Sequence, residues 1–355
     1  MSDLDDFADK ALLLDRLTRI EKQATKAKAE LRLARKQTEQ VVGERDLLLA
    51  RVAAYEIAAG ATPPRWLTPK KPKKSAATVV AMMSDLHLDE VVNVAEMGGV
   101  NAYDRRIAEM RLRRFCDATI DLASNYIAGV DIDGLCLLWG GDMCSGDIHD
   151  ELAQSNEGVS GIDTCVYWSP ILASCVATLA DHFGKVHISS VVGNHGRQTH
   201  KPRMKGRVRD NLDFLLATMT ANQLAADERI TWDIPDTADC LVEVYDTRIL
   251  LTHGDQIRGG GGGVGGLMAP VLRMIQKKRV NASFDVMAFG HFHQQILAPD
   301  QGVFACGSAK GVDEFSRLFN FPDCDPLQAF AVVTPTRGFT FTAPIFVGDQ
   351  KKEGW

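Results

Sequence analysis

The sequence lacks the features that mark secreted, membrane-spanning and zinc-ribbon proteins. Its 355 residues include eight scattered cysteines and no CxxC pair, which argues against a disulfide framework and a zinc ribbon. Their scatter is typical of reduced, buried thiols. No stretch approaches the run of about 20 apolar residues that a membrane span needs, and the acidic N-terminus has no basic start of a secretory signal. We therefore expect a cytoplasmic protein with no membrane partner.

Charge is unevenly distributed along the chain. The formal net charge is −6 at pH 7. Residues 1–75 carry 16 Lys and Arg against 11 Asp and Glu, a net of +5, whereas the other 280 residues carry 24 against 35, a net of −11. A basic N-terminal part joined to an acidic body indicates two regions with different roles.

The N-terminal region, residues 1–57, is expected to be a helical arm. Residues 4–57 contain no proline and one glycine, and seam positions recur at alternating spacings of three and four from Leu13 to Tyr55, the pattern of a coiled coil. The seam favours a homodimer or a higher homo-oligomer, and a single helix lying on the rest of the protein is the alternative. Residues 58–77 contain four prolines and paired lysines and are expected to be an extended linker.

Residues 78–355 show the alternation of an α/β domain. Five short apolar runs, starting at residues 78, 134, 186, 248 and 285, end in polar turns that contain glycine or histidine. Helix-length stretches at 106–129 and 169–184 separate some of them. Strands that are buried on both faces form such near-continuous apolar runs. The pattern predicts a mixed α/β domain with little helix in its C-terminal part.

Each of the five runs ends in side chains that could bind a metal ion. They are Asp85 and His87, Asp142, Asn194 and His195, His253, and His291 and His293. Because sites in α/β sheets form beyond the carboxyl ends of the strands, we expect these side chains to converge. Residues i and i+2 of extended backbone point to the same side, so His291 and His293 would face one point. Gly290 permits a close approach of the backbone to that point.

In this order, the motifs DxH, GD, GNH, H and GHxH resemble the signature of the calcineurin-like metallophosphoesterase superfamily. The resemblance covers roughly residues 78–345. "SDLHL" and the GHxH ending are most similar to the phosphodiesterase and nuclease branch, which includes the Mre11/SbcD-type DNA repair exonucleases. The resemblance implies a four-layer α/β/β/α sandwich with two metal ions between its sheets, here preceded by the helical arm.

The resemblance also implies a role for each position. One metal ion would be held by Asp85, His87 and His293, the other by Asn194, His253 and His291, and Asp142 would bridge them. His195 would be a general acid at the leaving oxygen, while a hydroxide between the metals attacks phosphorus. A mixed set of imidazoles and carboxylates suits Mn, Fe or Zn. We expect two divalent ions, with Mn²⁺ first and iron or zinc as alternatives.

Two acidic positions of the family pattern are absent. Gly196 follows GNH, where Asp or Glu is usual, and Ser145 holds the second acidic position of GDxxD. Each absent acid could have oriented groups around the catalytic histidine. Asp147, His149 and Asp150 are the candidates for a replacement.

A basic segment follows Gly196. Its candidate substrate contacts are Arg197, His200, Lys201 and Arg203, which could bind phosphates of a nucleic acid or nucleotide; a solvated loop is the alternative. We expect a hydrolase of phosphoric esters, a nuclease-like phosphodiesterase. A small-molecule phosphodiesterase for cyclic or dinucleotides, or a phosphomonoesterase, is the alternative. An inactive scaffold is disfavoured because every ligand position is filled.

Overall fold

The computed structural model describes residues 63–158, 160–257, 266–319 and 323–355, with scattered residues between Lys26 and Arg45. The chain divides into two units, Met1–Val52 and Ala53–Trp355. The described residues of the first unit are helical. Most of the predicted seam lies outside the described residues, so the coiled coil and the oligomer stay predictions.

The first sheet of the second unit carries three of the five predicted strands. Its strand order is β11-β10-β1-β2-β3-β4. Four strands are parallel, namely β1 (Ala76–Met83), β2 (Asp131–Trp139), β3 (Val186–Ser190) and β4 (Ile230–Asp233). Two antiparallel strands complete the sheet, β10 (Leu327–Thr334) and β11 (Gly338–Phe346). The parallel strands end together at one edge of the sheet.

The second sheet carries the other two predicted strands. Its order is β5-β6-β7-β9-β8. The strands are β5 (Asp239–Val244), β6 (Thr247–Thr252), β7 (Val286–Phe289), β8 (Ile296–Ala298) and β9 (Val303–Ala305). β6, β7 and β9 are parallel, and β5 and β8 are antiparallel to their neighbours.

Alternation along β1 explains how the sheets stack. Val80 and Met82 join the core between the sheets, which includes Ile249 and Leu251 of β6. The residues between them point to the opposite face, as the period of two requires. All eight residues of β1 are buried, because helices cover that second face.

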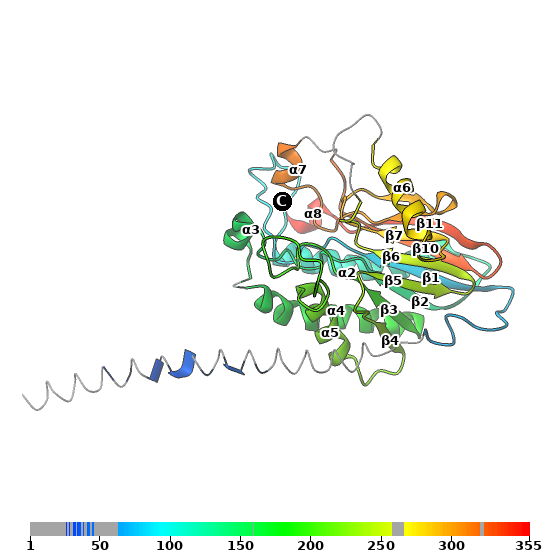
Figure 1. Ribbon diagram of the computed structural model, residues 1–355, viewed down its shortest axis with the longest axis horizontal. Coiled ribbons are helices and arrows are strands. Elements are labelled where there is room, and N and C mark those ends of the chain that lie inside the picture. Colours follow the sequence, from blue (N-terminus) through cyan, green and yellow to red (C-terminus); the bar gives the residue numbers. More distant parts are fainter. Residues whose placement is uncertain are drawn as a thin grey trace, which may run out of the picture. The chain divides into compact units, whose positions relative to one another are not determined.

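Helices cover the outer faces of both sheets (Figure 1). They are α2 (Arg105–Asp121), which continues as a π-helical turn (Leu122–Tyr126), α4 (Gly161–Phe183), α5 (Leu212–Gln223) and α6 (Met268–Arg279). α4 contacts β2 and β3 and lies between α2 and α5, which it also contacts. On the other side, Val271 and Ile275 of α6 pack on Leu250 and Met287 of the second sheet. The predicted four-layer α/β/β/α sandwich is confirmed.

Short elements lie in the connections. They are α3 (Asp150–Ser155), a 3₁₀ turn (Pro299–Gln301), α7 (Glu314–Leu318) and α8 (Gln350–Glu353). Within the described residues, the two helices after β9 are only five and four residues long, in agreement with the prediction of little helix in the C-terminal part.

Helix α4 departs from the expectation that no stretch suits a membrane. By length and composition alone, Gly161–Phe183 is apolar enough to span one, with a mean hydropathy of 1.3. Half of that window is buried within the protein, where Trp168 and Leu172 are fully enclosed. A helix in the core of a domain meets the same criteria, and the contacts of α4 are those of such a helix.

The end of the predicted linker is part of the folded unit. Leu67 is completely buried in the core between the sheets, and Trp66 packs against it. The Leu67 carbonyl accepts a hydrogen bond from Tyr245 N at 2.8 Å. The first strand begins at Ala76, two residues before the predicted domain start at residue 78.

Candidate metal centre

All the predicted ligands follow strand ends at one edge of the two sheets. Asp85 and His87 follow β1, Asp142 follows β2, Asn194 follows β3, His253 follows β6, and His291 and His293 follow β7. Within the described residues, the donor atoms of the six Asp and His ligands form groups in which all atoms lie within 4.8 Å of one another, and Asn194 Oδ1 lies 3.2 Å from His253 Nε2. The structure brings the seven residues together as predicted.

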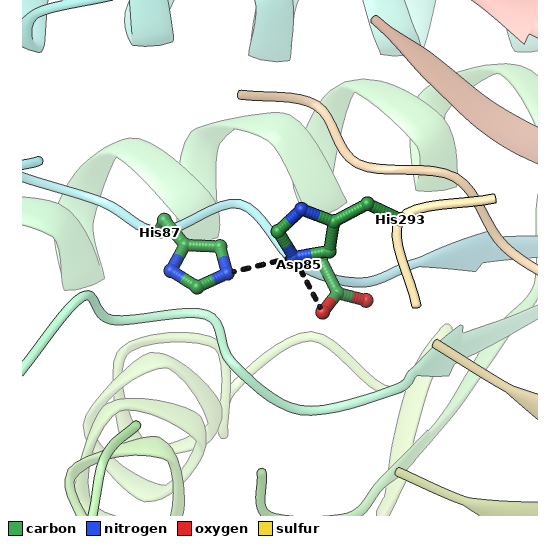
Figure 2. A group of neighbouring side chains, drawn as sticks. All are labelled: Asp85, His87 and His293. Atoms are coloured by element: carbon green, nitrogen blue, oxygen red, sulfur yellow. Dashed lines mark hydrogen bonds and ion pairs between the residues drawn. The ribbon is translucent and has the colours of Figure 1, made fainter. Parts of the chain in front are cut away.

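The first group contains Asp85, His87 and His293 (Figure 2). His87 Nε2 and His293 Nε2 are 3.1 Å apart, and His293 Nε2 lies 3.4 Å from Asp85 Oδ1. Burial, together with the charge of Lys310, lowers the pKa of His87 to about 4. The ring is therefore neutral at pH 7, which is the form that binds metals.

The second group contains Asp142, His253 and His291. His253 Nε2 lies 2.9 Å from Asp142 Oδ2 and 3.2 Å from Asn194 Oδ1. The rings of His253 and His291 meet edge to face, with centroids 5.2 Å apart. His291 and His293 thus lie in different groups, as the assignment implied by the resemblance has them, and not facing one point as their spacing alone suggested.

Asp142 connects the groups. It belongs to the second group and also to a third, with His87 and His195. The resemblance assigns His195 to catalysis and not to metal binding. One of its ring nitrogens nevertheless lies within 4.8 Å of the donor atoms of Asp142 and His87. One carboxylate between two ligand groups is what a bridging ligand requires.

The donor set of His253 fits a cation. His253 Nδ1 lies 2.8 Å from the Gly140 carbonyl, which can only accept. Nδ1 therefore carries the proton, and Nε2 faces the oxygen atoms of Asp142 and Asn194. Burial opposes a charge on His253, but the Asp142 carboxylate outweighs it and raises the pKa of His253 to about 10. The surroundings of His253 therefore stabilise a positive charge, and a divalent ion bound to Nε2 would supply one.

Backbone strain is concentrated at the site. Seven described non-glycine residues have a positive φ, and five of them are predicted ligands: Asp85 (53°), His87 (47°), Asp142 (49°), His291 (70°) and His293 (55°). Such conformations cost about 1–3 kcal/mol each and persist only where the fold enforces them. The expectation of extended backbone at His291 and His293 is therefore wrong. The side chains meet because the loops are forced into left-handed turns.

Gly290 has the predicted role. A Cβ at this position would lie 2.0 Å from Asp85 Oδ2 and 2.1 Å from Ser84 Oγ. The backbone therefore approaches the Asp85 carboxylate more closely than any other residue would allow. The His291 backbone N–H uses this proximity and donates to Asp85 Oδ2 at 3.0 Å.

The layers and their ligand-bearing strand ends agree with those that the resemblance to the calcineurin-like metallophosphoesterases implies.

Comparisons with known proteins add little to this description of the fold and the site. No protein-family model matches the chain, and no curated protein matches it. Among solved structures it is similar to a conserved protein of Streptococcus pneumoniae described as a predicted phosphoesterase, at 10% identity over 76% of this chain and 97% of that chain, with a TM-score of 0.29. It is also similar to the sulfate thiohydrolase SoxB of Thermus thermophilus, at 11% identity over 77% of this chain and 56% of that chain, with a TM-score of 0.29. Likenesses this distant say nothing about substrate.

No motif in the sequence points to Asp213, which organises the loops of the second group. Its Oδ2 accepts from the backbone N–H groups of Asp142 and Gly193, both at 2.8 Å, and its Oδ1 accepts from Met143 and Cys144 at 3.1 and 3.2 Å. Burial and the neighbouring charge of Asp142 raise the pKa of Asp213 to about 6. Asp213 lies 71 residues beyond Asp142, near the start of α5, so no local motif links the two.

Other side chains occupy the places of the two absent acids. A Cβ at Gly196 would lie 2.3 Å from Asn211 Oδ1, so the Asn211 amide fills the space beside it. Ser145 Oγ lies 3.3 Å from Glu90 Oε2 and donates to it. A carboxylate from the loop after β1 thus lies at the end of the Ser145 side chain.

None of the three candidate replacements, Asp147, His149 and Asp150, takes the place of an absent acid. Asp147 Oδ2 accepts from the Gly161 backbone N–H at 3.3 Å, at the start of α4. Asp150 begins α3. His149 is nearest to the catalytic histidine, with its ring edge-on to the His195 ring at 5.9 Å between centroids.

The predicted substrate contacts differ in availability. The Arg197 guanidinium donates to the backbone carbonyls of Asn194, Thr199 and His200 at 2.7–3.0 Å, so it shapes its own loop. His200 Nδ1 lies 3.3 Å from the Ile148 carbonyl. Lys201 and Arg203 are exposed, as is Lys205 after them.

Proposed function

We propose that this chain is a dinuclear metal-dependent phosphodiesterase of the hydrolase class, acting on nucleic acid. The observation that carries the proposal is the sharing of Asp142 between ligand groups from both sheets. Two nearby dications repel each other strongly, and a shared carboxylate offsets that repulsion. Mn²⁺ is the first choice for a set of imidazoles and carboxylates, with iron and zinc as alternatives.

The bound ions would neutralise the phosphoryl oxygens and acidify the attacking water. The protein's own part is to fix the ligand atoms before substrate arrives. Asp142 Oδ1 accepts from the His195 backbone N–H at 2.7 Å, while its Oδ2 lies at His253. Both oxygen atoms of this carboxylate are thereby held in place.

His195 is oriented to act on the leaving oxygen. Its Nδ1 lies 3.1 Å from the Ser145 carbonyl, so Nδ1 donates there. Nε2 is then the position from which the ring can deliver a proton. The ring lies against that of His87, with centroids 4.6 Å apart, which places it beside the first group.

Exposed positive charge in the segment that follows the ligand Asn194 favours a polyanionic substrate. The loop that starts at the ligand Asn194 leads to Lys201, Arg203 and Lys205, all exposed. Arg207 and Arg209 are instead paired with Asp255 and Asp236. In an acidic domain, a local cluster of three cations can attract a phosphate backbone.

The first test is hydrolysis by metal-stripped protein to which Mn²⁺ is restored. We expect cleavage of bis(p-nitrophenyl) phosphate in preference to p-nitrophenyl phosphate, and loss of it in Asp142→Asn. Preference for the monoester would favour a phosphatase. Binding of metal with no turnover of either ester would favour a scaffold.

A second test addresses the substrate. The triple variant Lys201→Ala/Arg203→Ala/Lys205→Ala should cleave labelled oligonucleotides more slowly and with a weaker salt dependence, while its rate on the small diester stays at the wild-type value. Equal losses on both substrates, or no loss on oligonucleotides, would favour a cyclic or dinucleotide as the substrate.

A further inference from the structure

A buried ion cluster lies behind His87. Lys310 Nζ donates to Glu90 Oε1 at 2.7 Å and also contacts the Asp313 carboxylate. The three residues are only 2–7% exposed. Burying charges is expensive, and apolar residues of similar size often stabilise a protein as well or better. The cluster therefore calls for an explanation other than stability.

Glu90 faces Nδ1 of His87, whereas the other ring nitrogen faces the first ligand group. Glu90 Oε2 lies 3.2 Å from His87 Nδ1, within ion-pair distance, although this contact does not count as a hydrogen bond. The opposite nitrogen, Nε2, faces His293. His87 thus lies between a carboxylate and the ligand group.

The loop that carries Lys310 is also tied to the other ligand of the DxH motif. Ser308 Oγ donates to the Asp85 carbonyl at 2.8 Å and accepts from the Lys310 backbone N–H at 3.2 Å. One loop after β9 therefore supports both Asp85 and, through Glu90, His87.

We propose that Glu90 and Lys310 are positioning residues for the metal ligand His87. The negative charge of Glu90, 3.2 Å from Nδ1, favours the imidazole proton on that nitrogen, which leaves the lone pair of Nε2 for the metal ion. Lys310 holds Glu90 in place and offsets its charge. This inference rests on the proposed function, because it needs a metal ion at the first group.

The two ligand groups differ in this respect. His253 Nδ1 donates to a neutral carbonyl, that of Gly140, whereas His87 Nδ1 faces a carboxylate. A carboxylate partner makes the bound imidazole a stronger ligand. Loss of Glu90 should therefore weaken one of the two metal sites selectively.

The test measures binding of Mn²⁺ to the full chain by electron paramagnetic resonance of the free ion. We expect wild type to bind two ions, and Glu90→Gln and Lys310→Met to bind one with wild-type affinity and the other about 10–100-fold more weakly. Glu353→Gln is the matched control. Glu353 is an equally buried carboxylate that pairs with Arg111, and its loss should leave both affinities unchanged.

A second measurement needs no variant at the cluster. In the Zn²⁺-loaded wild type, ¹⁵N chemical shifts should show the His87 ring protonated on Nδ1, with the signal assigned by its absence in His87→Gln. Protonation on Nε2 overturns the inference even if Lys310→Met fails to fold.

The outcomes separate the two proposals. If wild type binds no Mn²⁺, the proposed function fails and this inference with it. If wild type binds two ions and Glu90→Gln binds both as tightly, the inference alone is overturned. Equal weakening by the control Glu353→Gln would also overturn it, because the effect would then be one of stability.

Discussion

Replacing Asp213 by Asn should destabilise the loops that carry the second ligand group. The Asp213 carboxylate accepts four backbone N–H groups, two on each oxygen atom. In asparagine an NH₂ group replaces one oxygen atom. Two buried N–H groups then face a donor instead of an acceptor, whichever way the amide turns.

The magnitude follows from the unsatisfied donors. Each buried N–H without an acceptor costs about 1–3 kcal/mol, so two cost about 2–6 kcal/mol. Burial and Asp142 raise the pKa of Asp213 to about 6, which shows that the buried charge is itself unfavourable. Its removal offsets part of the loss, so we expect a net destabilisation near the lower end, about 2 kcal/mol.

Urea unfolding of the metal-free protein at pH 7 measures this free energy. Asp117→Asn, at an exposed position of α2, is the control and should change it by less than about 0.5 kcal/mol. A change as small as this in Asp213→Asn would refute the claim that its hydrogen bonds hold the loops. Mn²⁺ affinity should fall in parallel, because Asp142 N is one of the four donors.

Three further predictions concern other parts of the chain. Gly290→Ala should displace the Asp85 carboxylate, lower Mn²⁺ affinity in a titration by at least about tenfold and cost about 1–3 kcal/mol in unfolding; wild-type affinity would contradict the contact. Burial opposes the charge of Glu353, but Arg111 outweighs it and lowers its pKa, so this carboxylate stabilises the fold above its unfolded pKa of about 4.3 and that contribution is lost as the pH falls. Unfolding free energies at pH 7 and pH 4 should therefore differ less in Glu353→Gln than in wild type, and an equal difference would exclude this role. Light scattering should show a smaller assembly for a chain that begins at Ala58, which keeps the buried Leu67; an unchanged assembly would remove the coiled-coil dimer.

The sequence alone identified the strands and the residues at their ends. Apolar runs followed by glycine and by Asp, Asn or His are local patterns, and each of the five predicted runs overlaps a strand. The convergence of these ends followed from a general property of parallel strands. For the ligands from Asp85 to His293, order along the chain was therefore enough to predict that they meet.

Tertiary structure decided which other side chains support them. Glu90 and Lys310 are 220 residues apart, and Asp213 reaches Asp142 from a different layer, so no spacing in the sequence reveals either contact. The same holds for Arg197, whose charge suggested a phosphate contact but whose N–H groups are taken by nearby carbonyls. Local pattern sets which residues can act, whereas the partners of a buried charge depend on which segments the packed sheets bring together.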